Sequence, residues 1–339
     1  MKFAFIIDPI HHLNPAHDTS VALMEAAYEL GHEVWITQAS QLSVQEGKAG
    51  AKLTSVQLHS VQLQQGRWVV PQPWYELGVT AFHFLEEMDA VFMRTDPPVT
   101  IPYLYATHIL DYINPNKTLV VNAPAGLRTA NEKMYALRFP EFMPETIVTA
   151  SKEEIQAFLA EKGKVVLKPL AGKGGEGILV LVEGDRNFNS LVELSTHQVG
   201  EIRESPLPVM VQEFLPAASE GDKRIMLLDG EPLGAINRVP AANDYRGNMA
   251  VGGSVVKTEI TPAEREMCQK MTPTLRQDGL YFVGIDIIGG CLTEVNVTSP
   301  TGLREIQRLE NSDPAHRTIE WTVQRVQSQC DRSEAAQIG

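Results

Sequence analysis

The chain has 339 residues, 43% hydrophobic and 21% charged, which is typical of a globular protein and long enough for two or three domains. Its formal net charge of −13 argues against general binding of nucleic acids or anionic membranes, because both partners are negatively charged. The apolar run before Asp8 is too short for a signal peptide, and three widely spaced cysteines match no zinc motif. We therefore expect a cytoplasmic protein with reduced thiols.

The first 125 residues alternate between predicted strands and helices. An apolar strand at Phe3–Ile7 is followed by a helix at Val21–Leu30, with cap-type residues before it, and by a second strand at Glu33–Ile36. This βαβ opening predicts an α/β domain with a parallel sheet over residues 1–125. The Gln-rich stretch at 57–65 indicates a peripheral hairpin or irregular insertion. No GxGxxG follows the first strand, so the usual dinucleotide-binding fold is unsupported.

From about residue 130, predicted antiparallel strands mix with helices, which is typical of an α+β half. Turns at Asp229-Gly230 and Gly289-Gly290 predict two hairpins, and a helix is expected near Ala263–Gln277. The last residues, Gln329–Gly339, are expected to form a frayed tail.

The second hairpin carries a candidate metal site. Glu294 and Asn296 are two apart on one strand and therefore share a face, and Asp286 lies on the partner strand across the two-glycine turn. Two carboxylates and an amide oxygen suit Mg²⁺. The alternative is an acidic pair on a solvated sheet face. Apolar neighbours such as Ile285 and Val295 indicate burial instead, where unpaired carboxylates are costly.

A glycine-rich segment, Pro169–Gly177, connects two predicted strands. Its backbone N–H groups could close over phosphate oxygens as a flap, whereas a plain hairpin turn is the alternative interpretation. It is not a Walker A loop, because no Gly-Lys-Ser/Thr and helix follow. Lys168 ends the apolar strand before it and is well placed to reach a phosphate.

The strand Val209–Pro216 turns irregular at its proline and could offer backbone groups to an adenine edge, although core packing explains these residues equally well. Scattered lysines and arginines are usually solvated, but Arg238 ends a strand that we expect to lie opposite Arg224 on the first hairpin. The stretch Val239–Ser254 is either a lid or a surface loop by composition alone.

Taken in order, these segments resemble the bacterial glutathione synthetases of the ATP-grasp ligase superfamily, over nearly the whole length. The resemblance rests mainly on two specific motifs, Val283–Ile288 and Thr293–Thr301. Supporting motifs are Asp18–Ser20, Met93–Pro98, Asn131–Lys133, Leu167–Leu170, Gly172–Gly175, Gly221–Arg224 and Arg246–Asn248.

The resemblance implies a small N-terminal α/β substrate domain at 1–125, followed by an ATP-grasp fold of two α+β subdomains. These would be a central subdomain with the flap at 126–210 and a C-terminal subdomain at 211–328 with the metal site and a lid at 239–254, before the tail at 329–339. It also implies ATP-dependent ligation of γ-glutamylcysteine and glycine through an acyl phosphate. Mg²⁺, or else Mn²⁺, would be the cofactor, and the assembly would be a homotetramer without nucleic-acid or membrane partners.

The family's roles carry over to matching positions. The metal would be held by Asp286, Glu294 and Asn296. The transferred phosphoryl group would be stabilised by Arg224, Arg238 and Arg246. ATP would be bound by Lys133, Lys168, Gly172, Lys173, Gly174, Gly175, Gln212, Glu213, Phe214, Leu215 and Asp222. The γ-glutamylcysteine substrate would be gripped by Asp18, Ser20, Arg94, Asp96, Ser299 and Arg304.

The sequence departs from the family pattern at Thr95, where a lysine is expected, and at Glu213 and Phe214 in the hinge. Two rival functions stay open. Another ATP-grasp ligase would keep the nucleotide residues but lose the N-terminal set around Asp18 and Arg94. A regulatory ATP-binding protein would not require three phosphate-directed arginines.

Overall fold

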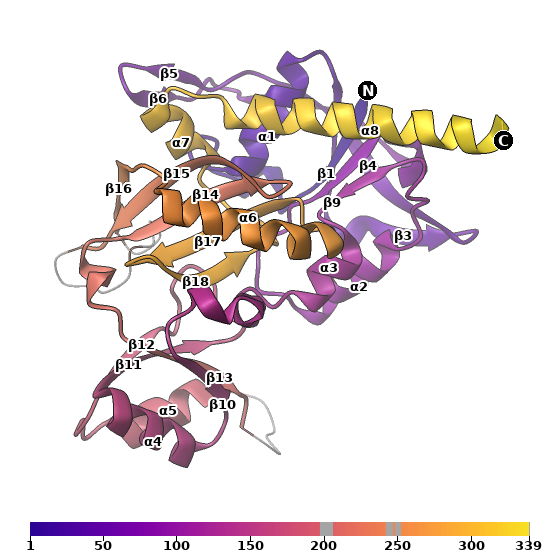
Figure 1. Ribbon diagram of the computed structural model, residues 1–339. Coiled ribbons are helices and arrows are strands. Elements are labelled where there is room, and N and C mark those ends of the chain that lie inside the picture. Colours follow the sequence, from indigo (N-terminus) through magenta and orange to yellow (C-terminus); the bar gives the residue numbers. More distant parts are fainter. Residues whose placement is uncertain (197–205, 242–246, 248–251, 339) are drawn as a thin grey trace.

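In the computed structural model, the chain forms three β-sheets covered by helices, and a small two-stranded ribbon (Figure 1). The structure describes residues 1–196, 206–241, 247 and 252–338. Two of the sheets share hydrophobic cores and form the body of the molecule. The third has a core of its own and projects from the body as a separate lobe. The predicted α/β half followed by an α+β half is confirmed.

The N-terminal sheet contains the predicted parallel strands, in the order β2-β1-β8-β9. Antiparallel strands extend it beyond β2, where β4 pairs with β2, β3 and β7. The strands are β1 (Lys2–Ile6), β2 (Glu33–Thr37), β3 (Leu42–Gln45), β4 (Lys48–Leu58), β7 (Tyr75–Phe84), β8 (Ala90–Met93) and β9 (Leu119–Val121). The Gln-rich stretch forms the end of β4 and the peripheral ribbon of β5 (Gln62–Gln64) and β6 (Arg67–Val69), as predicted.

Helices cover both faces of this sheet, because alternate strand residues point to opposite sides. Phe3 and Phe5 of β1 belong to the core that contains α1, whereas Ala4 and Ile6 belong to the core that contains α2 and α3. Asp18 caps α1 by accepting a hydrogen bond from the N–H of Val21 at 2.9 Å. The helices are α1 (Thr19–Glu29), α2 (Ile101–Leu110) and α3 (Pro124–Thr129).

The five-stranded sheet is antiparallel, in the order β16-β15-β14-β17-β18. Both predicted hairpins are present, β14 to β15 and β17 to β18. Helix α6 covers one face, and α7 and α8 cover the other. On each side, the buried residues belong to the same hydrophobic core as residues of the N-terminal sheet. The elements are β14 (Asp222–Leu228), β15 (Glu231–Val239), β16 (Ser254–Lys257), β17 (Phe282–Ile288), β18 (Cys291–Asn296), α6 (Pro262–Gln277), α7 (Leu303–Glu310) and α8 (Pro314–Ile338).

The prediction of a frayed tail over Gln329–Gly339 is corrected by the structure. Helix α8 continues through Ile338 and lies along α1 of the N-terminal half (Figure 1). Buried Ile319 and Val326 of α8 belong to the same core as α1. The polar composition of these last residues does not reveal that they continue a helix whose buried apolar residues lie farther upstream.

The lobe is a four-stranded antiparallel sheet with the order β10-β13-β11-β12. Helices α4 and α5 pack on one of its faces around Ile155, Leu159 and Val192. The boundary predicted between residues 210 and 211 would cut β13, which pairs with β10 and β11, so the lobe extends to Glu213. The elements are β10 (Thr146–Thr149), α4 (Lys152–Lys162), β11 (Lys164–Pro169), β12 (Leu179–Val182), α5 (Phe188–Thr196) and β13 (Val209–Glu213).

Short 3-10 helices connect several of these elements, at Ile10–His12, Ala39–Gln41, Leu85–Glu87, Met134–Arg138, Pro140–Phe142 and Pro216–Ser219. Among the described residues, no helix combines the length and the apolar character needed to cross a membrane.

Candidate active site

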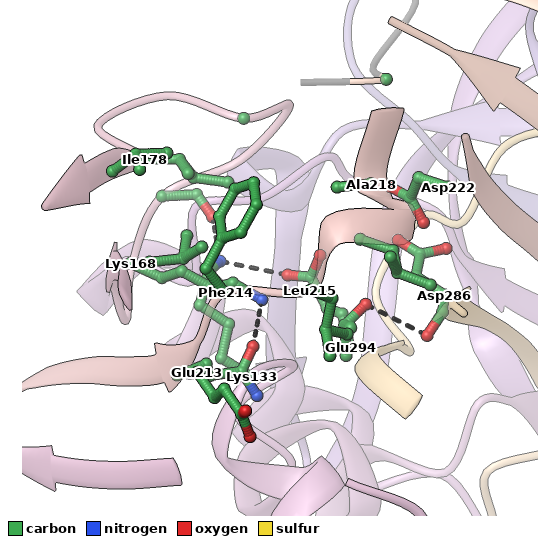
Figure 2. Close-up of a pocket in the computed structure, with 18 of the residues that line it drawn as sticks. Lys133, Lys168, Ile178, Glu213, Phe214, Leu215, Ala218, Asp222, Asp286 and Glu294 are labelled. Atoms are coloured by element: carbon green, nitrogen blue, oxygen red, sulfur yellow. Dashed lines mark hydrogen bonds and ion pairs between the residues drawn. The ribbon is translucent and has the colours of Figure 1, made fainter. Parts of the chain in front are cut away.

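A cavity of about 940 Å³ lies between the lobe and the body, where β11, β12 and β13 face β14, β17 and β18 (Figure 2). The residues predicted for ATP or metal that line it are Lys133, Lys168, Gly172, Gly174, Gly175, Gln212, Glu213, Phe214, Leu215, Asp222, Asp286 and Glu294.

Lys133 joins the flap to the C-terminal hairpin at one end of the cavity. Its ammonium donates to the carbonyl oxygen of Gly172 at 2.7 Å and to Oε1 of Glu294 at 3.1 Å. The side chain is buried, so this positive charge is held against two fixed acceptors. A buried cation beside backbone N–H groups of a glycine-rich segment suits the binding of phosphate.

Lys168 lies at the end of β11 and points toward the same space (Figure 2). Its ammonium donates to Oε1 of Gln212, and Nε2 of Gln212 donates to Oγ1 of Thr146 at 3.1 Å. Because an ammonium can only donate, the first bond fixes which way the amide faces. Burial lowers the pKa of Lys168, although Glu294 and Asp222 favour its charged form.

The opposite end of the cavity is apolar. Phe214 and Leu215 follow β13, and Ile178 faces them from the end of the flap (Figure 2). Nζ of Lys164 lies 3.6 Å from the centre of the Phe214 ring. An apolar wall at the hinge between the lobe and the body suits a flat heterocyclic base.

The flap requires glycine at specific backbone positions. Gly175 and Gly177 have φ of +84° and +68°, in the left-handed region that side chains with a Cβ rarely adopt. A Cβ on Gly177 would also lie 2.8 Å from Cγ of Pro169. Gly172, Gly174 and Gly175 line the cavity, and because glycine has no side chain their backbone groups face it directly.

The C-terminal hairpin brings its polar residues together as predicted. Asp286 on β17 pairs directly with Glu294 on β18. Asn296 lies two residues farther along, and its Nδ2 donates to Oδ2 of Asp286 at 3.2 Å. The three side chains therefore share one face of the five-stranded sheet.

Two arginines hold Asp286. Nε and Nη2 of Arg224 lie 2.8 Å from its two carboxylate oxygens, and Nη2 of Arg238 lies 3.0 Å from Oδ2. Arg238 also donates to Oδ2 of Asp222 at 2.6 Å. The strand register places Arg238 opposite Asp222, which corrects the expectation that it lies opposite Arg224.

The two aspartates of this network have different acidities. Burial disfavours the charge of Asp286, but Arg224 and Arg238 outweigh it and hold the pKa well below its usual range. Burial raises the pKa of Asp222 to about 6, because Arg238 offsets the loss of solvent only in part and Asp286 adds repulsion. Asp286 is therefore the fixed negative charge of the site.

The hairpin fits a divalent cation that prefers oxygen ligands. Within the described residues, neither Oε2 of Glu294 nor Oδ1 of Asn296 accepts a hydrogen bond. No group of three His, Cys, Asp or Glu side chains suited to a metal occurs in the part of the chain that the structure describes. With the amide oxygen of Asn296, the face carries two carboxylates and one amide, an all-oxygen set that suits Mg²⁺ better than zinc.

A second polar group lies at the carboxyl ends of the N-terminal strands, where ligands of open α/β sheets commonly bind. Arg94, directly after β8, is buried and donates from Nε to Oγ of Ser20 at 3.1 Å and from Nη2 to the carbonyl oxygen of Pro300 at 3.0 Å. Burial raises the pKa of nearby Asp18. Oδ2 of Asp96 lies 3.9 Å from Nζ of Lys173, so a flap residue contacts this group.

Comparison with known families agrees with this two-part arrangement. Residues 1–128 match the family model described as "Prokaryotic glutathione synthetase, N-terminal domain", and residues 132–311 match "Prokaryotic glutathione synthetase, ATP-grasp domain". The glutathione synthetase of Nostoc sp. (strain PCC 7120) is 62% identical over 97% of this chain and 100% of its own length. That of Thermosynechococcus vestitus is 58% identical over 95% of this chain and 99% of its own.

The chain belongs to the prokaryotic glutathione synthetase family. It is accordingly an ATP-dependent ligase. Solved structures share its fold at low sequence identity. The D-cycloserine synthetase DcsG has a TM-score of 0.63 at 14% identity, covering 96% of this chain and 100% of that one. The ATP-grasp ligase PsnB has a TM-score of 0.60 at 16% identity, covering 96% and 98%.

Of the three remaining predicted residues of this glutathione synthetase family member, two lie in the described part of the chain. Arg304 is buried between α7 and α1, where Nη2 donates to Oε2 of Glu25 at 2.6 Å and Nε to the carbonyl oxygen of Pro15 at 3.2 Å. Ser299 is half-buried in the segment between β18 and α7. Arg246 and most of the predicted lid lie outside the described residues, although Gly247 lines the cavity.

Sequence reasoning missed several lining residues. Val166 and Val180 lie on the face of the lobe sheet that its helices leave uncovered. Val166 could have been predicted, because residues two apart on a strand share a face and Lys168 was already assigned to the cavity. The others are Glu176, Ile178, Ala218, Gly247, Ile288 and Thr293. Glu132, beside Lys133, was also missed, since no local pattern separates it from a solvated glutamate.

Proposed function

We propose that this chain is a glutathione synthetase that joins γ-L-glutamyl-L-cysteine to glycine and converts ATP to ADP and phosphate. The observation that carries the proposal is the 62% identity to the Nostoc glutathione synthetase over that protein's whole length. The similarity thus includes the N-terminal half, with Arg94 and Ser20, as well as the nucleotide cavity.

In the proposed reaction, a carboxylate oxygen of the cysteinyl residue attacks the γ-phosphorus of ATP, and the bond to the ADP oxygen breaks. The glycine amine then attacks the carbonyl carbon of the acyl phosphate, phosphate leaves, and the amine loses a proton. No nucleophile from the protein is needed. Lys133, Lys168 and Arg238 supply positive charge around the phosphates, so positioning and electrostatic stabilisation account for the catalysis.

The proposal includes a divalent ion. Asp286, Glu294 and Asn296 would hold Mg²⁺, with Mn²⁺ as the alternative, and the bound ion would neutralise charge on the phosphate oxygens. Support comes from the shared face of the three side chains and from the oxygens of Glu294 and Asn296 that no described residue engages.

The dipeptide site is proposed at the carboxyl ends of the N-terminal strands. Arg94 would bind a substrate carboxylate, because its buried Nη1 has no hydrogen-bond partner among the described residues. Ser20 orients the guanidinium, and Asp18 and Asp96 offer acceptors for the substrate's ammonium. The Lys173–Asp96 contact supports the idea that this site and the flap act together.

We further propose a cytoplasmic homotetramer that acts on small molecules, without nucleic-acid or membrane partners. Exposed apolar side chains on the N-terminal half support an assembly, among them Val79 of β7 at 79% exposure and Tyr105 of α2 at 65%. Light scattering after size-exclusion chromatography tests the tetramer, and a monomer at micromolar concentration would contradict it.

The test of the function is phosphate release from ATP, measured with each combination of dipeptide and amine. Release that requires both γ-glutamylcysteine and glycine is the expected result. Turnover with other acid and amine pairs would instead identify a different ATP-grasp ligase. Binding of ATP without turnover would identify a regulatory nucleotide-binding protein.

A further inference from the structure

A second cavity of about 690 Å³ lies beside the nucleotide cavity. Its walls come from the segment after β8, from α2 and α3, and from the start of the flap. Lys133 and Gly172 line both cavities. Because these residues mark the phosphate end of the nucleotide cavity, the second cavity opens next to the place where an acyl phosphate would form.

Glu132 lines this second cavity and is held in one orientation. Its Oε1 accepts three hydrogen bonds: from the N–H of Val297 at 2.8 Å, from the N–H of Thr298 at 3.0 Å and from Oγ1 of Thr298 at 2.8 Å. The donors follow Asn296 directly on the chain. The position of the carboxylate is therefore tied to the end of the metal-binding hairpin.

Within the described residues, the other oxygen, Oε2, is not engaged. It accepts no hydrogen bond from any described residue, and it belongs to a side chain that lines the cavity. No described lysine, arginine or histidine forms an ion pair with Glu132. The neighbouring ammonium of Lys133 is already engaged by Glu294 and Gly172.

A carboxylate that is partly buried and lacks a protein cation is costly, and a cationic ligand group would remove that cost. We propose that Oε2 of Glu132 binds the ammonium group of the acceptor amino acid, which makes the second cavity the binding site of the amine substrate. This inference rests on the proposed function, in which the acceptor is glycine.

Arg128 supports an amino acid as the ligand. It lines the same cavity, and although its Nη2 pairs with Asp111 at 2.7 Å, its buried Nη1 has no hydrogen-bond partner among the described residues. A zwitterion carries a carboxylate as well as an ammonium group. Positive charge from Arg128 on one wall and Oε2 of Glu132 on another therefore match both ends of a small amino acid.

The decisive variant is Glu132→Gln, assayed in the full-length enzyme. Its amide oxygen still accepts the three bonds at Oε1, while an NH₂ group replaces Oε2 and repels an ammonium. Loss of one hydrogen bond between charged groups predicts a KM for glycine raised roughly tenfold or more. The KM values for ATP and γ-glutamylcysteine should stay within about twofold of those of the wild type.

A second readout separates binding of the amine from formation of the acyl phosphate. Hydroxylamine, added in place of glycine, captures an acyl phosphate as a hydroxamate and needs no ammonium site. Hydroxamate formation by Glu132→Gln is expected to equal that of the wild type. In the wild-type enzyme, glycolate has a hydroxyl in place of the ammonium and should inhibit with a Ki at least tenfold above the KM of glycine, which tests the proposal even if the variant does not fold.

Two control variants show whether the change in KM belongs to Oε2 itself. Thr298→Val removes a donor to Oε1 but leaves Oε2 in place, so its KM for glycine should change much less than that of Glu132→Gln. Glu141→Gln removes an exposed carboxylate outside both cavities and should match the wild type.

The outcomes distinguish this proposal from the proposed function. A wild-type enzyme without turnover on γ-glutamylcysteine and glycine would reject the function itself. Two results would reject only the amine site while the wild type remains active. One is a Glu132→Gln variant whose three KM values are all raised equally, and the other is a glycolate Ki close to the KM of glycine. In that case Glu132 serves solely to position the hairpin.

Discussion

Arg224 and Asp286 form a two-point ion pair, with Nε and Nη2 each 2.8 Å from a carboxylate oxygen. Both side chains are buried. Arg224 also approaches the carbonyl oxygen of Thr301 through Nη1 at 3.4 Å. In this arrangement the arginine positions the carboxylate proposed to bind the metal and the backbone at Thr301, rather than facing the proposed phosphate site directly.

Arg224→Met is therefore expected to lower the free energy of unfolding by about 3–5 kcal/mol, because it leaves a buried carboxylate with only one arginine. Arg224→Lys retains the charge but not the two-point geometry, so its stability should fall between those of the wild type and Arg224→Met. Urea unfolding measures both variants. The matched control is Arg276→Met, which breaks the half-exposed pair with Asp229 and should cost about 1 kcal/mol or less.

Glu294→Gln tests the metal assignment. The variant keeps the shape of the side chain but loses the charge that pairs with Lys133 and that a divalent ion requires. We expect kcat to fall at least roughly a hundredfold, the Mg²⁺ concentration for half-maximal rate to rise, and the melting temperature to change little. Glu183→Gln, an exposed change on the lobe, is the control. Unchanged activity of Glu294→Gln would remove the metal site from this hairpin.

The parts of the site that sequence predicted are those set by short-range geometry. A two-glycine turn and an alternation of two residues suffice to place Asp286 opposite Glu294 and beside Asn296. Likewise, an apolar strand ending at Lys168 and running into glycines identifies the flap. In both cases the decisive neighbours are at most about ten residues apart, so local strand geometry determines their arrangement.

The parts that sequence could not predict depend on contacts across the whole chain. Glu132 is bound by Val297 and Thr298, and Arg304 is bound by Glu25, with more than 160 residues between the partners in each case. A glutamate or an arginine at such a position looks like any solvated residue. Only the packing of the five-stranded sheet against the N-terminal half shows that these groups are buried and paired.

Asp222 predicts a pH dependence of stability. Its pKa rises from the ordinary value of 3.8 to about 6 in the folded protein, because burial disfavours its charge. The folded state then binds a proton more readily than the unfolded chain does. The stability that this proton confers is complete below about pH 4 and is lost as the pH rises through about 6.

Asp222→Asn removes that titration. In the absence of nucleotide, the melting temperature of the wild type should fall relative to that of the variant between about pH 4 and pH 7. Asp286 stays ionised in the folded protein over this range and is present in both proteins, so the comparison between them isolates Asp222. Calorimetry of both proteins across this interval measures the effect. A constant difference in melting temperature would contradict the raised pKa.

Arg304 provides the clearest contrast between the role expected from resemblance and the contacts that the structure gives it. Resemblance assigns it to the dipeptide substrate. In the structure its guanidinium pairs with Glu25 of α1, reaches the carbonyl oxygen of Pro15 and lies 4.9 Å from the ring of Trp68. These contacts hold α7 against the first helix of the N-terminal half.

Arg304→Met is therefore expected to lower the free energy of unfolding by about 3–5 kcal/mol, since Glu25 would remain buried without its partner. The Arg304→Met protein that does fold should have a KM for γ-glutamylcysteine within about threefold of the wild-type value. The double variant Arg304→Met with Glu25→Gln should recover part of the lost stability, because no uncompensated charge remains. A normal unfolding curve combined with a strongly raised KM for the dipeptide would instead support direct contact between Arg304 and the substrate.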